Sequence, residues 1–227
     1  MVVFLSRLII TSEAAVSKLF PAGFGWQTAS IIAANNSLSP DSIGFALSTG
    51  TGDAIGVFLG HIAYYRLKKS AGGCVDMKEV AQTGTLLSTA AFCSGTAWQP
   101  IVNALQGMDM PFTTVFGGTW LGCASAFYFG LRTSRAILPR IGFDKIEESP
   151  NHLNDLQLST SIGGASAFFV GTDTAYLLNQ NFLAGIVGIF PNTPILSGCA
   201  IAGTSTSLGF FATQNLLNIA MPKSWTD

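Results

Sequence analysis

The chain of 227 residues has the length of one ordinary soluble domain, but its composition argues against that class. Charged residues make up 10% of the chain, where a soluble domain carries roughly 25%, and apolar residues reach 48%. So few charges cannot cover the surface of such a chain in water, and so apolar a chain is not intrinsically disordered. The formal net charge is −1 and the sequence has no basic stripe, so we expect the lipid bilayer, and not nucleic acid, as its partner.

The N-terminal segment, residues 1–18, differs from a secretory signal because no basic segment precedes its apolar residues. Its apolar side chains are interleaved with Arg7, Glu13 and Lys18. This mixture predicts a short helix that lies in the membrane interface. A targeting segment that is later trimmed is the alternative interpretation.

Gaps between charged residues predict where the chain crosses the membrane, because a spanning helix needs about 20 mostly apolar residues. Four gaps contain no Asp, Glu, Lys or Arg, and two further stretches contain one aspartate each. The predicted spans run over residues 19–36, 43–65, 80–105, 112–134, 157–178 and 194–221. We therefore expect one all-α, multi-pass integral membrane domain over residues 1–227, built as a compact bundle of six transmembrane helices.

The composition of two connecting segments also indicates their structure. Residues 181–194 are too short to cross and predict a re-entrant or interfacial piece. Residues 139–156 predict a polar loop, whose metal-ligating side chains are Glu147, Glu148, His152 and Asp155. A solvated loop of mixed charge is the stronger interpretation of this group, so we predict no metal site.

The basic residues sort to one side of the predicted membrane. Even numbers of crossings separate their groups, so six crossings place all eleven Lys and Arg residues on one side. The opposite side receives Asp41 and Asp109 but no basic residue. The positive-inside rule then puts both termini on the cytosol-like side, which in an organelle is the stroma or matrix.

Small residues fill the predicted spans, and they are most regular at Gly52, Gly56 and Gly60. Lipid gives helices no hydrophobic reason to associate, so close backbone contact along such a stripe supplies the attraction. The stripe predicts tight packing within the bundle, or contact with membrane-protein partners or a second copy of the chain.

An internal repeat is indicated by the likeness of residues 47–60 in the second predicted span to residues 158–171 in the fifth. These spans run in opposite directions, so the match predicts a three-plus-three inverted repeat, as in many secondary transporters. The likeness of residues 122–130 to residues 163–171 competes with this scheme, and segments rich in Gly and Ala also match by chance.

Asp53 is the strongest candidate for a functional residue, because a carboxylate in the middle of a span is costly unless it is paired, hydrated or protonated. His61 lies eight residues further on, about 80° around the helix, so the two could line one side. Asp173 lies in the fifth span, nearer the side without basic residues. Together they predict an ion- or proton-binding site that faces a polar cavity. The alternatives are a packing role for Asp53 and interfacial positions for His61 and Asp173.

The third predicted span contains Gln99, Pro100 and Asn103. A proline inside a helix frees a carbonyl and kinks the chain, and the neighbouring amides could then bind an ion or solute. Gln99 and Asn103 therefore join the candidate site, with a purely structural role in the bundle as the alternative.

These residues favour a small channel or secondary transporter with an ion- or proton-linked site around Asp53. The alternative is a structural or assembly subunit of a larger membrane complex, organellar and pigment- or lipid-binding, in which His61 could ligate a pigment metal. We predict no enzymatic activity, because Asp53 and His61 alone do not make a catalytic site, and the sequence indicates no particular cofactor.

Overall fold

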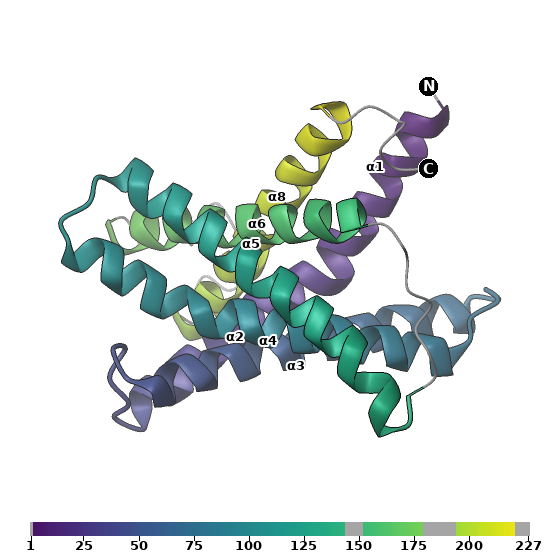
Figure 1. Cartoon of the computed structure of the whole chain (residues 1–227), viewed down its shortest axis with the longest axis horizontal. Coiled ribbons are helices and arrows are strands. Elements are labelled where there is room, and N and C mark those ends of the chain that lie inside the picture. The colour runs from purple at the N-terminus through teal and green to yellow at the C-terminus, as the bar shows by residue number, and fades with distance from the viewer. Residues whose placement is uncertain (1, 144–151, 179–193, 221–227) are drawn as a thin grey trace.

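The computed structural model describes residues 2–143, 152–178 and 194–220, and the elements in these ranges are all helical (Figure 1). The predicted all-α class is therefore confirmed. The helices are α1 (Val2–Ala14), α2 (Phe20–Asn35), α3 (Ile43–Ser70), α4 (Met77–Gly107), α5 (Phe112–Ile137), α6 (His152–Leu178) and α8 (Pro194–Ala220). Two short turns adjoin them, the π-helix η1 (Ala15–Leu19) and the 3-10 helix η2 (Leu138–Ile141).

Each predicted span falls on one helix, in order, from α2 to α6 and then α8. The helices are longer than several of the spans, because charged residues do not end a helix. α3 continues past the last apolar residues to Ser70. The chain turns at Gly72, whose φ of 88° is a left-handed conformation that glycine adopts without strain. Gaps between charges thus mark the apolar part of a helix and not its ends.

The two connecting segments lie partly outside the described residues, which exclude 144–151 and 179–193. The prediction of a polar loop over 139–156 was wrong at its C-terminal end. Helix α6 begins at His152, and Asp155 lies in its first turn, where a carboxylate is favoured by the helix dipole. The re-entrant piece predicted over 181–194 falls outside the description, except that Pro194 already belongs to α8.

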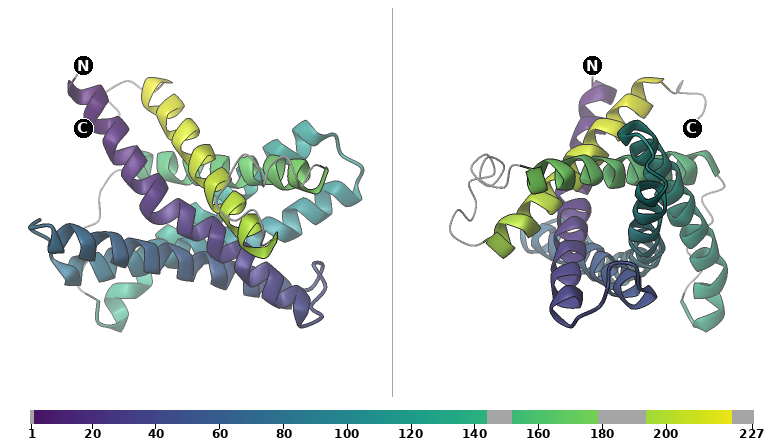
Figure 2. Two further views of the ribbon diagram at one scale, coloured as in Figure 1. Left: turned by 180° about the vertical axis from the view of Figure 1, so that it is seen from behind. Right: turned by 90° about the vertical axis from the view of Figure 1, so that its left-hand side faces the viewer.

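The N-terminal segment is not a separate helix. α1, η1 and α2 follow one another without a break and form a single rod from Val2 to Asn35 (Figure 2, left). The helix predicted over residues 1–18 is therefore part of a longer rod, because nothing in that segment breaks a helix before Pro21. The π-helical turn η1 lies just before this proline, whose ring and missing N–H disturb the regular helical bonding pattern.

The six long helices form a closed ring. Each one contacts its neighbours along the chain, and α8 also packs against α2 and so closes the circle (Figure 2, right). The loops at 36–42, 71–76 and 108–111 are short, so consecutive helices run antiparallel. The loops 36–42 and 108–111 lie at one end of the ring, and the loop 71–76 lies at the other (Figure 1). We call the first the acidic end and the second the basic end, after Asp41 and Asp109, and after the lysines that flank loop 71–76.

Large apolar side chains lie on the outside of this bundle as well as in its core. Large apolar side chains point outward on the ring; Leu121 is 71% exposed and Phe129 is 68% exposed. Many buried residues are hydroxyl-bearing, and Thr49, Thr119 and Ser161 are fully buried. Exposed apolar faces of this kind mark contact with lipid or with another protein.

By length and composition, α3 and α8 are the described helices that could cross a membrane. The two of them suggest an association with membranes. Helix α2, with 16 residues, is shorter than the roughly 20 residues that a span needs.

The glycine stripe of α3 packs within the chain. Gly52, Gly56 and Gly60 lie directly against the backbone of η1 and α2, and a Cβ at Gly56 would clash with the main chain of Pro21. Gly25 of α2 faces Gly52 in the same way. The stripe therefore allows α2 and α3 to approach at backbone distance, as predicted for packing inside the bundle.

Candidate functional site

Two adjoining cavities lie inside the helix ring. The larger, of about 100 Å³, receives side chains from all six long helices. The smaller, of about 40 Å³, lies further toward the acidic end and is bounded by α2, α3, α4, α6 and α8. Asp53, Ser166 and Thr206 line both of them. These three residues therefore mark the junction of the two cavities, which we call the axial site.

Asp53 supplies the carboxylate of the axial site. It lies within α3 and keeps some accessible surface, although it is in the middle of the bundle, because it faces the cavities. No hydrogen bond or ion pair reaches it from the residues that the structure describes. On its other side the carboxylate packs against Gly95 of α4, where a Cβ would stand 2.7 Å from Oδ2. Glycine at position 95 thus makes the room for this carboxyl group.

Three aromatic rings close the smaller cavity. The ring centroids of Trp26 and Trp98 lie 4.7 Å apart, and each lies 5.1 Å from the ring of Phe169. Their orientation is fixed, because the indole N–H of Trp26 donates to the carbonyl of Gly95 at 3.2 Å and that of Trp98 to the carbonyl of Ser166 at 3.1 Å. The rings form an apolar wall between the axial site and the acidic end.

The two hydroxyl groups of the axial site both donate to their own helices. Ser166 Oγ donates to the carbonyl of Ile162 at 3.1 Å, and Thr206 Oγ1 donates to the carbonyl of Ala202 at 2.7 Å. Thr206 Oγ1 keeps its lone pairs free to accept, and Ser166 Oγ keeps at least one free beside its contact with the Cys123 thiol. A ligand in the cavity would thus meet oxygen acceptors and no free hydroxyl hydrogen.

Lys18, from η1, lines the larger cavity toward the basic end. Burial lowers the pKa of this lysine, and the carboxylate of Glu13 acts in the opposite direction and raises it. Asp53 and Lys18 are the ionisable residues among the described side chains that line the two cavities. No ion pair joins them, so Lys18 does not neutralise the carboxylate.

His61 does not share the axial site with Asp53. It lies two turns further along α3, is 2% exposed, and packs against Tyr65 and Gly84. Neither ring nitrogen makes a well-formed hydrogen bond with the described residues, although the main chain of Val80 lies close to the ring. The packing of α4 directs this imidazole away from both cavities.

Gln99 and Asn103 lie together, but at the acidic end. Gln99 Nε2 donates to Asn103 Oδ1 at 2.7 Å, and Asn103 Nδ2 donates to Asp41 Oδ1 at 2.7 Å. The pair thus holds loop 36–42 against α4, and it does not line the cavities. Asp173 lies in α6, and its side chain is outside the described part of the structure.

The acidic group predicted for the polar loop is divided. Glu147 and Glu148 lie outside the described residues, whereas Asp155 is buried between α5 and α6. Arg135 Nη2 donates to Asp155 Oδ1 at 2.7 Å, and Arg132 Nη1 lies 3.6 Å from Oδ2. The described residues contain no group of three His, Cys, Asp or Glu side chains that could hold a metal ion.

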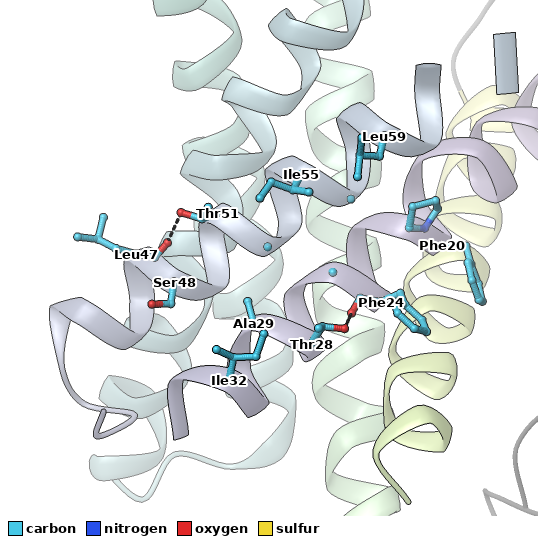
Figure 3. Close-up of a pocket in the computed structure, with 14 residues that line it drawn as sticks. Phe20, Phe24, Thr28, Ala29, Ile32, Leu47, Ser48, Thr51, Ile55 and Leu59 are labelled. Atoms are coloured by element: carbon cyan, nitrogen blue, oxygen red, sulfur yellow. Dashed lines mark hydrogen bonds between the residues drawn. The ribbon is translucent and has the colours of Figure 1, made fainter. Parts of the chain in front are cut away.

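A second hollow lies on the outside of the ring, between α2 and α3. This groove has a volume of about 810 Å³ and an apolar lining that includes Phe24, Ile55 and Leu59 (Figure 3). The hydroxyls of Thr28 and Thr51, which also line it, donate to the main chain of their own helices (Figure 3). The groove therefore offers a ligand little besides apolar contact.

Sequence reasoning identified Asp53 and missed the residues around it. Gly95, Ser166 and Thr206 lie in stretches rich in small residues, where no local pattern sets them apart. The arrangement of the whole helix ring decides which helix faces pack together, and no local sequence pattern indicates this. Comparison with protein families, with curated proteins and with solved structures finds no match to this chain.

Proposed function

We propose that the chain is a multi-pass membrane protein whose six long helices all cross the bilayer. The support is the agreement of the helices with the charge gaps, the apolar outer faces, and the separation of basic and acidic ends along the ring. Small and hydroxyl-bearing residues face inward, where helices pack without a hydrophobic drive.

Within that bundle we propose a small channel or secondary transporter with an ion- or proton-linked site at Asp53. The observation that carries this proposal is an unpaired carboxylate at the junction of two internal cavities, on the axis of a closed helix ring. A carboxylate in such a place is costly, and its usual use is to bind a proton or an ion in passage.

The test is flux through the purified protein in proteoliposomes. Wild-type protein is expected to pass protons or a cation, and Asp53→Asn is expected to abolish or uncouple that flux. Asp109→Asn is the matched control, because it removes the same charge in an exposed loop and asparagine tolerates the φ of 53° found there. Equal flux in wild type and Asp53→Asn, or none in wild type, would contradict the proposal.

The second candidate is a subunit of a larger membrane complex that binds a lipid or pigment. The outer groove between α2 and α3 favours it, since its apolar lining suits an acyl or isoprenoid chain. His61 is buried away from that groove, so it is not a ligand for a pigment bound there. Extraction in mild detergent tests this role, and a stable monomer without bound lipid or pigment would contradict it.

A further inference from the structure

The smaller cavity contains four side-chain hydrogen-bond donors, and all four are already used. The indole N–H groups of Trp26 and Trp98 donate to main-chain carbonyls, and so do the hydroxyls of Ser166 and Thr206. The remaining lining residues are Gly23, Gly95 and Phe169, which have no side-chain donor, and Asp53. An ionised carboxylate has no donor either.

The hydrogen-bonding groups that remain free in the smaller cavity are therefore all acceptors. Both oxygens of Asp53 and the lone pairs of the Ser166 and Thr206 hydroxyls are acceptors that face the cavity. A buried acceptor without a partner is costly, and an unpartnered carboxylate is more so. An anion would meet only repulsion here, whereas a cation or an ammonium group would satisfy every free position.

The volume limits the size of such a ligand. A water molecule needs roughly 10–15 Å³ of this kind of space, so a cavity of about 40 Å³ holds an ion with a few waters at most. The aromatic wall of Trp26, Trp98 and Phe169 blocks expansion toward the acidic end. Metabolites and large organic cations are thus excluded.

The charge of the axial site limits the charge of the cation that it can bind. A single carboxylate is neutralised by one positive charge, and Lys18 adds a cation-repelling group further along the larger cavity. Divalent cations hold their hydration shells more strongly than monovalent ones, and one carboxylate with two hydroxyl groups does not replace such a shell.

From these four observations we infer that the axial site takes a small monovalent cation, either ammonium or an alkali metal ion. The ion sits in the smaller cavity against Asp53, with the oxygens of Ser166 and Thr206 as further ligands. It reaches this position from the larger cavity, which shares those three residues. This inference rests on the proposed function, of which it names the substrate class.

The experiment measures cation binding without transport. The full chain, purified in mild detergent, is unfolded by heat in chloride salts of ammonium, sodium, potassium or choline at one ionic strength. A ligand that binds the folded state raises the unfolding midpoint in a saturable way. At least one of the three small cations is expected to do so relative to choline, which is too large for the cavity.

Two aspartate variants locate the effect. Asp53→Asn is expected to lose the cation-dependent shift, and Asp109→Asn is expected to keep it. A shift that persists in Asp53→Asn, or the same midpoint in all four salts, would overturn the inference.

Two hydroxyl variants test the geometry. Thr206→Val and Ser166→Ala each remove one oxygen ligand at little change in volume. Contacts to a charged group contribute about 1.5 kcal/mol or more, so each variant is expected to weaken cation affinity about tenfold. Unchanged affinity in both variants would overturn the inference.

The two proposals fail in different ways. Saturable, Asp53-dependent stabilisation without any flux would keep the cation site and contradict transport. Asp53-dependent flux with no stabilisation by a small cation would keep transport and contradict the cation site.

Discussion

Asp155 makes the shortest ion pair among the described residues, and its two arginine partners are unequal. The carboxylate side chain is 4% exposed, Arg135 is 15% exposed, and Arg132 is 39% exposed. A buried charge that loses its partner keeps its desolvation cost, whereas an exposed pair contributes little. At the residue scale, burial and not the number of ion pairs decides which arginine matters.

We expect Arg135→Met to destabilise the protein by about 3–5 kcal/mol, because it leaves Asp155 buried with a single distant partner. Arg132→Met is the control and should cost under about 1 kcal/mol. The free energy of unfolding by denaturant in mild detergent measures both. Equal losses in the two variants would contradict this account, and Arg135→Met combined with Asp155→Asn should be milder than Arg135→Met alone.

Helices were the most predictable elements, and their contacts the least. Long gaps between charged residues located all six long helices. A long run of small and apolar residues that contains no charge and no helix-breaking residue can form few other structures. The contact of Asp53 with Gly95 joins residues 42 positions apart on two helices and depends on how α3 and α4 are rotated. The hydropathy of a helix rich in small residues is nearly uniform around its axis, so periodicity does not show how the helix is rotated. It therefore left open whether His61 lies beside Asp53 or, as in the structure, against Tyr65.

The glycine stripe of α3 is the clearest packing device at the element scale. We expect Gly56→Ala to destabilise the protein by about 1–3 kcal/mol, because the new methyl group meets the main chain of Pro21 and Ala22, which cannot yield. Gly117→Ala in α5 is the control, since a Cβ there meets nothing within 4 Å and alanine favours the helix by about 1 kcal/mol. Thermal unfolding midpoints compare the two. A neutral or stabilising Gly56→Ala would show that α2 and α3 are not in backbone contact.

The inverted repeat stays a prediction. In the ring, α3 and α6 are three places apart and so lie opposite each other, which is the relation that a three-plus-three repeat requires. The aligned partner of Asp53 in α6 is Gly164, so the two halves would contribute unequally to the axial site.

At the scale of the whole molecule, the sorting of charges predicts the threading. Cys74 is an exposed cysteine in loop 71–76 at the basic end, and Met108 is 64% exposed at the acidic end. In sealed vesicles we expect a membrane-impermeant thiol reagent to label Cys74 from the cytosol-like side alone. A Met108→Cys, Cys74→Ser double variant should be labelled from the opposite side alone.

This labelling tests α4 directly, because α4 is the helix that separates the two positions. The labelling result is most informative for α4, since α4 is less apolar than α3 and α8. Labelling of both positions from one side would contradict the six-span threading.

The contact between α8 and α2 has a consequence for biogenesis. The walls of the larger cavity extend along the chain from Ala14 to Phe210, so no shorter stretch encloses it. While the ribosome is still producing α6, the first helix of the ring has no closing partner and the axial carboxylate has an open side. Arrival of the last helix therefore closes the ring and encloses both cavities in one step.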